Sequence, residues 1–260
     1  KKQYTQAAGH WEKATEEKKD LSPAYRNLAI FYYNKENDHG KAMDVMEKAC
    51  TLDPEYPRIW LEYDQLAARM NLPVMKRLEV MESHPAVTAG RDDLYLRYLT
   101  LLNDVGRYQE ALDGLRSRQF HPWEGGEGKV STQYKYALIH LAMEKLEEKE
   151  PQEALELLEA TLSYPENLGE GKLPNVPDNE AHYYMGLAYR QLGDTKKAEE
   201  YFRLASSGPQ EPGSVLYYND QPSDFIYYQG LANQELGMDH AAKKSFHQYR
   251  RLENSICLIW

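Results

Sequence analysis

The chain has 260 residues and a net charge of −10; 42% of its residues are hydrophobic and 28% are charged. These fractions exclude a disordered chain, and the acidic balance disfavours binding to the phosphates of nucleic acids. Apolar runs such as Ile256 to Trp260 are far shorter than the roughly 20 residues that a bilayer span needs, so we expect no membrane insertion.

The residue types favour helices. Leucine occurs 31 times, against 8 valines and 6 isoleucines, and β-branched residues lose rotamer freedom in a helix. Cys50 and Cys257 are the two cysteines, too few for a disulfide framework or a cysteine zinc knuckle. The stretch from Lys1 to Asp20 has no apolar core of signal-peptide length, so the sequence leaves the compartment open between cytoplasm and periplasm.

A repeat of two helices runs along the chain. The second helix of each predicted pair begins near a small or apolar residue, and the steps between these residues are 35, 32, 37, 43, 44 and 44; the residues are Ala7, Ala42, Val74, Ala111, Ala154, Ala198 and Ala242. We expect a second helix without its partner in 1–22, three repeats in 23–118, three repeats with long loops in 119–254, and a tail in 255–260. Together they form one predicted domain.

The clearest copy of the repeat has its landmarks at steps of 3, 4, 5, 4 and 3 residues: Gly186, Tyr189, Gly193, Ala198, Phe202 and Ala205. Steps of three and four keep side chains on one helix face. Gly193 should end the first helix of the pair, where a left-handed backbone favours glycine. The helix that begins near Val74 is the weakest copy, because Pro73 and Pro85 shorten it.

This pattern resembles the tetratricopeptide repeat, most closely at Gly186 to Tyr189, at the turn Leu192-Gly193-Asp194 and at the ending Ala49 to Pro54. The resemblance implies an all-α fold, a right-handed superhelical solenoid of antiparallel helix pairs. It also implies that the first helix of each pair faces a concave groove, where a peptide or helix could bind. By spacing, the groove candidates are Arg26, Tyr33, Asn103, Tyr183, Arg190, Tyr227 and Gln234.

Three connections are about ten residues longer than the 34-residue period of that repeat: 119–133, 163–179 and 206–223. Because they occupy equivalent positions, we expect them to lie side by side along one edge of the solenoid. The stretch His121 to Lys129 also aligns with Tyr164 to Lys172, 43 residues later, and both contain Gly-Glu-Gly and a final Lys.

Two interpretations of these loops stay open. In one, proline and glycine shape the turns and glutamate accepts hydrogen bonds from N–H groups of the next loop or helix. In the other, the loop edge is a docking or ligand surface. The candidate residues for that surface are His121, Trp123, Glu124, Glu127, Glu166, Asn167, Glu170, Tyr217, Tyr218 and Asp220.

No catalytic set emerges from the sequence. Gly125 to Gly128 lacks the Gly-Lys-Ser/Thr of a phosphate loop, and no nucleophile elbow or His-Glu-x-x-His helix is present. His121, Glu124 and Glu127 are metal-ligand types at close spacing, but a surface or capping role is the commoner one for such residues. We therefore expect no enzyme, no cofactor and no metal in this chain alone.

The loops also resemble stretches of large bacterial proteins in which a mutarotase-like β domain precedes tetratricopeptide repeats. That resemblance implies an N-terminal domain upstream of this chain. The leading hypothesis is a non-catalytic scaffold that contacts a protein, a peptide or that N-terminal domain through its groove and loop edge. The alternative is an accessory module of a carbohydrate-active enzyme whose loops contribute to a sugar site, a role suggested by Trp123 beside the repeated Gly-Glu-Gly loops.

Overall fold

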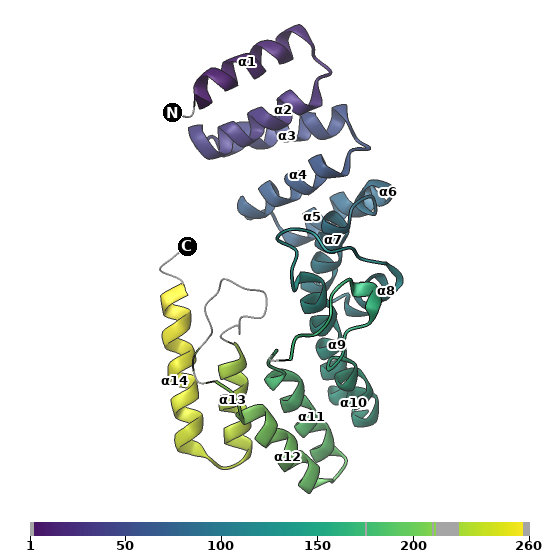
Figure 1. Cartoon of the computed structure of the whole chain (residues 1–260), viewed down its shortest axis with the longest axis vertical. Coiled ribbons are helices and arrows are strands. Elements are labelled where there is room, and N and C mark those ends of the chain that lie inside the picture. The colour runs from purple at the N-terminus through teal and green to yellow at the C-terminus, as the bar shows by residue number, and fades with distance from the viewer. Residues whose placement is uncertain (1–2, 175, 210, 212–223, 257–260) are drawn as a thin grey trace. The chain divides into compact units, whose positions relative to one another are not determined.

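The structure is a computed structural model that describes residues 3–174, 176–209, 211 and 224–256, with side chains up to residue 252. Every regular element in these ranges is a helix, which confirms the all-α fold class (Figure 1). None of the described helices is long and apolar enough to cross a membrane. The chain divides into two compact units, Lys1–Arg107 and Tyr108–Trp260.

The first unit holds a single helix followed by helix pairs. Its helices are α1 (Tyr4–Glu17), α2 (Ser22–Phe31), α3 (His39–Leu52), α4 (Pro57–Arg69), α5 (Val74–Ser83), the short α6 (Pro85–Thr88) and α7 (Asp92–Asp104). Each helix from α1 to α4 packs against the next one, and α4 also contacts α7. A π-helical turn, Tyr32–Glu36, extends α2. The core between α2, α3 and α4 contains Leu28, Met46, Ile59 and Ala67.

The second unit repeats the arrangement with longer connections. Its helices are α8 (Tyr108–Ser117), α9 (Lys129–Glu147), α10 (Pro151–Ala160), α11 (Asn179–Gln191), α12 (Thr195–Ser206), α13 (Asp224–Glu235) and α14 (Asp239–Ile256). Neighbouring helices pack in chain order, and the first helices α9, α11 and α13 also contact one another in sequence. The helix pairs therefore stack within this unit, as a solenoid requires.

The division into units falls inside one predicted repeat. The last of the three repeats expected in 23–118 has its first helix, α7, in the first unit and its second helix, α8, in the second. The buried clusters are likewise local: one spans Ala8 to Ala67, another Ile139 to Ala188, and a third Ala198 to Ala232. A repeat contacts mainly its neighbours, so a chain of this kind builds several cores instead of one.

The tight turns share one backbone feature. Gly193 has φ of +80°, as the sequence predicts for the residue that ends the first helix. The corresponding turns at Gly106 and Gly237 are also left-handed, and so are those at Asn37, Asn71 and Lys149. Asparagine tolerates this conformation, whereas lysine adopts it at a cost of about 1–2 kcal/mol.

A glycine in the first helix lets the second helix approach closely. A Cβ atom at Gly186 would lie 2.5 Å from the ring of Phe202, and one at Gly230 would lie 2.6 Å from the ring of Phe246. The aromatic residue of the repeat frame thus packs against a helix surface that has no side chain at that point. The 44-residue period is therefore a period of packing as well as of sequence.

The weakest predicted helix is present and short. Pro73 precedes the first residue of α5, and Pro85 is the first residue of α6. Leu78 and Met81 are buried in the unit, as the repeat frame requires. The two prolines thus limit α5 to ten residues, since proline fits the start of a helix but not its interior.

Candidate functional site

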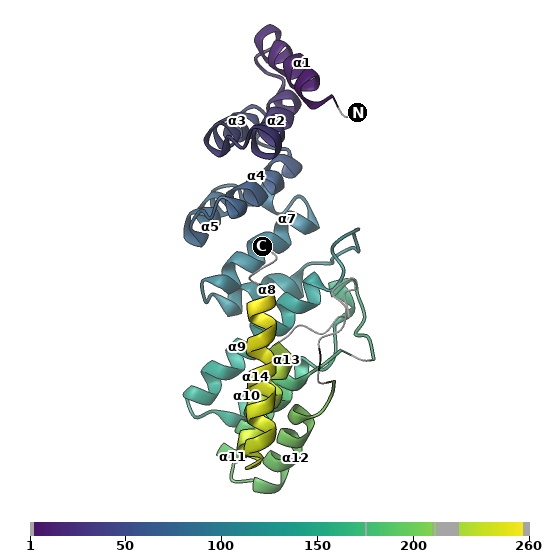
Figure 2. The same cartoon turned by 90° about the vertical axis from the view of Figure 1, so that its left-hand side faces the viewer.

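Two of the three long connections lie against each other in the second unit. The backbone N–H of Phe120 donates to the carbonyl of Asn167 over 2.7 Å. The side-chain amide of Asn167 donates to the carbonyls of Leu115 and Arg118, at 2.8 and 2.9 Å, and so caps the end of α8. Gly169 approaches so closely that a Cβ atom there would lie 2.6 Å from the carbonyl oxygen of Phe120. Figures 1 and 2 show these two loops running together.

Glu170 holds the second loop to the start of α9. Its carboxylate accepts hydrogen bonds from the backbone N–H groups of Gly128 and Ser131, at 2.8 and 3.0 Å, and from the hydroxyl of Ser131 at 2.7 Å. This is the capping role expected for the loop glutamates, but the capped helix lies 39 residues upstream instead of following the loop. A carboxylate is favoured there because N–H groups at a helix start lack partners within the helix.

The two loops enclose a cleft of about 610 Å³, which we call the loop cleft. Val130 and Leu168 are buried beneath it. Trp123 forms part of its wall and lies over Gly126, where any Cβ atom would come within 2.2 Å of the indole ring. The polar residues that line the cleft are His121, Glu124, Glu127, Glu170 and Lys172.

The charges around the loop cleft differ in how firmly they are held. Lys172 donates to Asp178 over 2.6 Å, and burial lowers the pKa of Lys172 although Asp178 opposes that shift. Glu170 is engaged at the start of α9, as described above. Glu124 and Glu127 are exposed to solvent. The acidic side chains at the rim are therefore those best placed to meet a ligand.

The structure does not assemble a metal site from these residues. Among the described residues, no group of three or more histidine, cysteine, aspartate or glutamate side chains is placed to hold a metal ion. His121, Glu124 and Glu127 line one cleft without converging on a point. Glu166, also predicted for the loop edge, is exposed in the turn that precedes Gly169.

The third long connection cannot be compared with the first two. Tyr217, Tyr218 and Asp220, predicted for the loop edge, lie outside the described residues, as does Gly213. The prediction that three loops share one edge therefore stays a prediction for the third loop.

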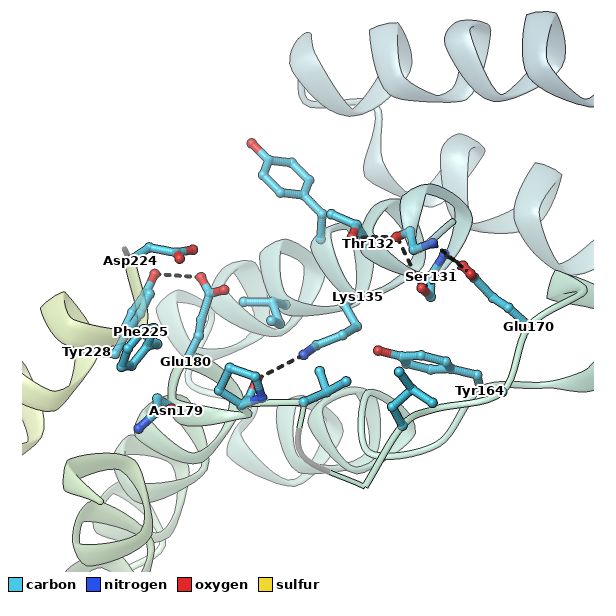
Figure 3. Close-up of a pocket in the computed structure, with 17 residues that line it drawn as sticks. Ser131, Thr132, Lys135, Tyr164, Glu170, Asn179, Glu180, Asp224, Phe225 and Tyr228 are labelled. Carbon is cyan, nitrogen blue, oxygen red and sulfur yellow. Dashed lines mark hydrogen bonds between the residues drawn. The ribbon is translucent and has the colours of Figure 1, made fainter. Parts of the chain in front are cut away.

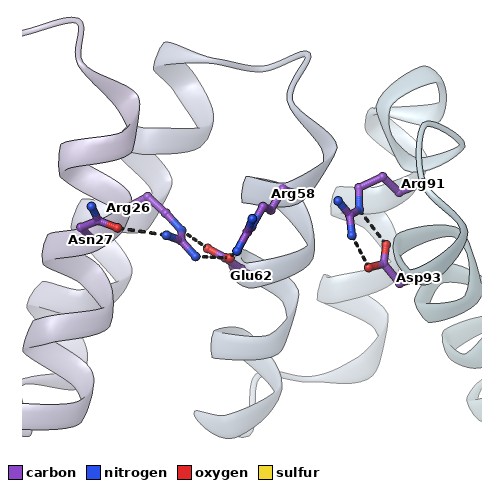
Figure 4. A network of polar contacts seen from close by, with 6 residues as sticks. All are labelled: Arg26, Asn27, Arg58, Glu62, Arg91 and Asp93. Atoms are coloured by element: carbon purple, nitrogen blue, oxygen red, sulfur yellow. Dashed lines mark hydrogen bonds and ion pairs between the residues drawn. The ribbon is translucent and has the colours of Figure 1, made fainter. Parts of the chain in front are cut away.

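One groove candidate of the first unit, Arg26, is held in an ionic network. Arg26 and Arg58 both bind the carboxylate of Glu62, and Arg26 also donates to Asn27 (Figure 4). Tyr33 lines a separate hollow of about 210 Å³ between α2 and α4.

Asn103 corrects the groove prediction. Its side chain is only 1% exposed, so it belongs to the interior of the first unit and not to an open surface. The reason is its place on α7 next to Leu102, in a helix with buried residues on more than one face.

The groove candidates of the second unit have mixed surroundings. Tyr183 is half-buried, with its ring against those of Phe202 and Tyr228. Arg190 forms an ion pair with Glu235. Tyr227 is 38% exposed, and Gln234 is exposed on the same helix, α13.

Sequence reasoning missed four residues of a smaller cavity beside the loop cleft: Lys135, Tyr164, Glu180 and Tyr228. Tyr164 and Lys172 stand at the two ends of the aligned loop segment, and this alignment was the sequence feature that could have drawn attention to Tyr164. Glu180 and Tyr228 are 48 residues apart, and no pattern in the sequence links them.

The stacked helix pairs, their left-handed turns and the loop cleft define the chain as a helical-repeat protein. The family model for the tetratricopeptide repeat matches residues 23–56 and, in a second form, residues 140–212. These stretches cover α2 and α3 in the first unit and the end of α9 to α12 in the second. Segments of both units are thus similar to the tetratricopeptide repeat.

Three solved structures are among those similar to the chain. The crystal structure of YrrB, titled a TPR protein with an unusual peptide-binding site, aligns with a TM-score of 0.51 and 20% identity; the match covers 76% of this chain and 91% of YrrB. Naa15/Naa10 bound to HypK-THB gives 0.48 and 15%, covering 95% of this chain and 34% of that one. PilW, titled a type IV pilus biogenesis factor, gives 0.47 and 16%, covering 89% and 93%.

Proposed function

We propose that this chain is a non-catalytic scaffold that binds a protein or peptide, with the loop cleft as its main contact surface. The observation that carries the proposal is that some residues of the two loops hold the structure together while others line the open cleft. Asn167 and Glu170 of the second loop hold that loop to α8 and α9. Trp123, Glu124 and Glu127 of the first loop line the open cleft. A rigid frame that presents an aromatic ring and free charges loses little entropy when a partner binds.

Two kinds of partner suit this surface. A peptide fits the dimensions of the cleft, and the related fold of YrrB includes a peptide-binding site by its title. The sequence resemblance to larger bacterial proteins adds a second candidate, an N-terminal β domain of the same parent protein. Within the second unit, the groove residues Arg190 and Tyr227 provide further candidate contacts in either case.

Selection from a random peptide library tests the proposal. The full chain is immobilised, and selected peptides are then measured in solution by calorimetry against the wild type and Trp123→Ala. We expect the affinity of the selected peptides to fall at least tenfold in Trp123→Ala, because a large buried contact is lost. Glu200→Ala, an exposed change on α12, serves as the control. A library that yields no peptide above background, or peptides indifferent to changes in both cleft and groove, contradicts the proposal.

The composition of the cleft also supports the second candidate function, a contribution to a sugar site. An indole ring beside exposed carboxylates can stack on a sugar ring and accept hydrogen bonds from its hydroxyls. A glycan array compared between wild type and Trp123→Ala separates the two functions. Glycan binding that disappears in the variant favours the sugar site, and an array without signal for either protein removes it.

A further inference from the structure

A smaller cavity of about 220 Å³ adjoins the loop cleft in the second unit (Figure 3). It lies among α9, the loop before α11, and the starts of α11 and α13. The two hollows share Glu170, Gly171 and Leu173 as lining residues. The two hollows are therefore immediate neighbours in the second unit.

Aromatic rings form much of the wall of this cavity. Tyr136, Tyr164, Phe225 and Tyr228 all line it. Burial raises the pKa of Tyr164 to about 12, so its phenol stays neutral at physiological pH. Rings of this kind attract cations through the negative charge of their faces, most strongly where water is excluded.

A buried carboxylate stands at one end of the cavity. Glu180 accepts a hydrogen bond from the hydroxyl of Tyr228 over 2.5 Å, and within the part of the chain that the structure describes it forms no ion pair. Burial raises the pKa of Glu180, and the charge of Asp224, which lies beside it, adds to the shift. A cation placed here would relieve the cost of keeping this carboxylate charged.

The lysine in the cavity wall, Lys135, is bonded to groups other than Glu180. Lys135 donates to Asp178 over 3.0 Å and to the carbonyl of Pro177 over 3.4 Å. Asp178 also accepts from Lys172, so one carboxylate holds two ammonium groups. The charge of Lys135 lowers the pKa of Glu180, but by less than burial raises it.

Helix packing explains part of the arrangement around Glu180. The first unit contains a similar bond, from the hydroxyl of Tyr32 to Glu12 over 2.8 Å, so a tyrosine–glutamate bond can serve to join two helices. The first turn of α11 also favours a negative charge. Neither point accounts for a cavity with aromatic walls beside the carboxylate.

We propose that this cavity binds the cationic side chain of a lysine or arginine, carried by the protein partner that occupies the loop cleft. The inference rests on the proposed function. A cation with an apolar stem suits the site because its charge meets Glu180 while its methylene groups contact the rings of Phe225 and Tyr228. The adjoining cleft favours a side chain of a bound peptide over a free amine.

The test uses small probes and the full chain. N-acetyl-lysine N-methylamide and its arginine counterpart are titrated into labelled protein and followed by NMR, with the norleucine counterpart as an uncharged control. We expect a cationic probe to shift the amide signals of residues around the cavity and to bind at least tenfold more tightly than norleucine. Glu180→Gln should weaken the cationic probe at least tenfold, whereas the matched variant Glu200→Gln, at an exposed position on α12, should leave it unchanged.

The outcome of the probe titration can be distinguished from the outcome of the peptide selection. Equal binding of the cationic and norleucine probes, or binding unaffected in a Glu180→Gln variant with an otherwise unchanged spectrum, overturns the inference. If selected peptides lose affinity in Trp123→Ala yet tolerate norleucine at every lysine and arginine, the scaffold function stands and the inference fails. If cationic probes bind at Glu180 but no peptide is selected, the proposed function fails while the cation site is supported.

Discussion

At the residue scale, the turn of each helix pair depends on one left-handed residue. Glycine occupies this position in three pairs and asparagine in two, and both tolerate a positive φ. Lys149, between α9 and α10, is the exception, with φ of +67°. The carbonyl of Lys145 accepts a hydrogen bond from the N–H of Glu150, so the same helix ending forms despite the strained residue.

Replacement of Lys149 by glycine should therefore stabilise the second unit. Relief of the left-handed strain exceeds the entropy lost by glycine, and we expect the free energy of unfolding to rise by about 1 kcal/mol. Urea unfolding followed by circular dichroism measures the change. Glu148→Gly, at a position with φ of −70°, is the matched control and should lower stability by about 1 kcal/mol. Equal losses in both variants would refute this account of the turn.

Buried histidines make stability depend on pH in a defined direction. Burial lowers the pKa of His140, whose ring stacks on that of Tyr108, and burial is also the largest cause of a lowered pKa at His182. Above the ordinary histidine pKa of about 6.5 both states are neutral, and the histidines add no pH dependence. As the pH falls below that value, the unfolded chain binds protons first, and stability is lost.

The substitution His140→Gln should make this loss smaller. Unfolding free energies of wild type and variant are compared at pH 7.5 and pH 5.5, where the difference between the two slopes isolates His140 from other titrating groups. We expect a shallower decline in the variant, with His182 maintaining part of the slope. An identical decline in both proteins would show that burial of His140 does not affect its protonation.

At the scale of elements, the second long loop acts first as a cap for helices that lie earlier in the chain than the pair it joins. Glu170 satisfies N–H groups at the start of α9, and Asn167 satisfies carbonyls at the end of α8. Asn179 does the same for the carbonyls of Ala205 and Ser207 at the end of α12. The added residues thus replace contacts that a short turn would leave to water.

The capping role predicts different effects on stability for Glu170 and Glu127, which occupy aligned positions in the two loops. Glu170→Ala removes three hydrogen bonds to a carboxylate and should lower the free energy of unfolding by about 1–3 kcal/mol. Glu127→Ala, at the aligned and exposed position, should change it by less than about 0.5 kcal/mol. Chemical unfolding of both variants checks the pair. Similar losses would mean that the two loops are equivalent supports and that Glu127 is not free for a ligand.

At the scale of the whole molecule, the two compact units have separate buried clusters. Repeat proteins unfold in steps when the coupling between neighbouring parts is weak compared with their own stability. We therefore expect calorimetry of the full chain to resolve more than one transition. Gly186→Ala, which would force a Cβ atom against Phe202, should shift one transition and leave another in place. A single transition that shifts as a whole would show that the chain is one cooperative unit.

The sequence by itself determined the helical class and the repeat frame, because these depend on local spacing. Gly193 and Ala198 recur at intervals set by the helix period and by tight turns, so neighbouring residues suffice to read them. The same logic located the loops and offered capping as one of two interpretations of their glutamates. It failed at Asn103, a polar residue at a groove spacing that is only 1% exposed in the folded chain.

Only the tertiary structure decided which carboxylates are bonded within the protein and which are exposed to solvent. Glu170 meets the start of α9 across 39 residues of sequence, and Glu180 meets Tyr228 across 48. Such pairs form when stacked repeats bring distant segments together, and burial then sets the cost of each charge. That is why the sequence could name candidate residues on the loop edge, whereas it gave no sign of the cavity around Glu180.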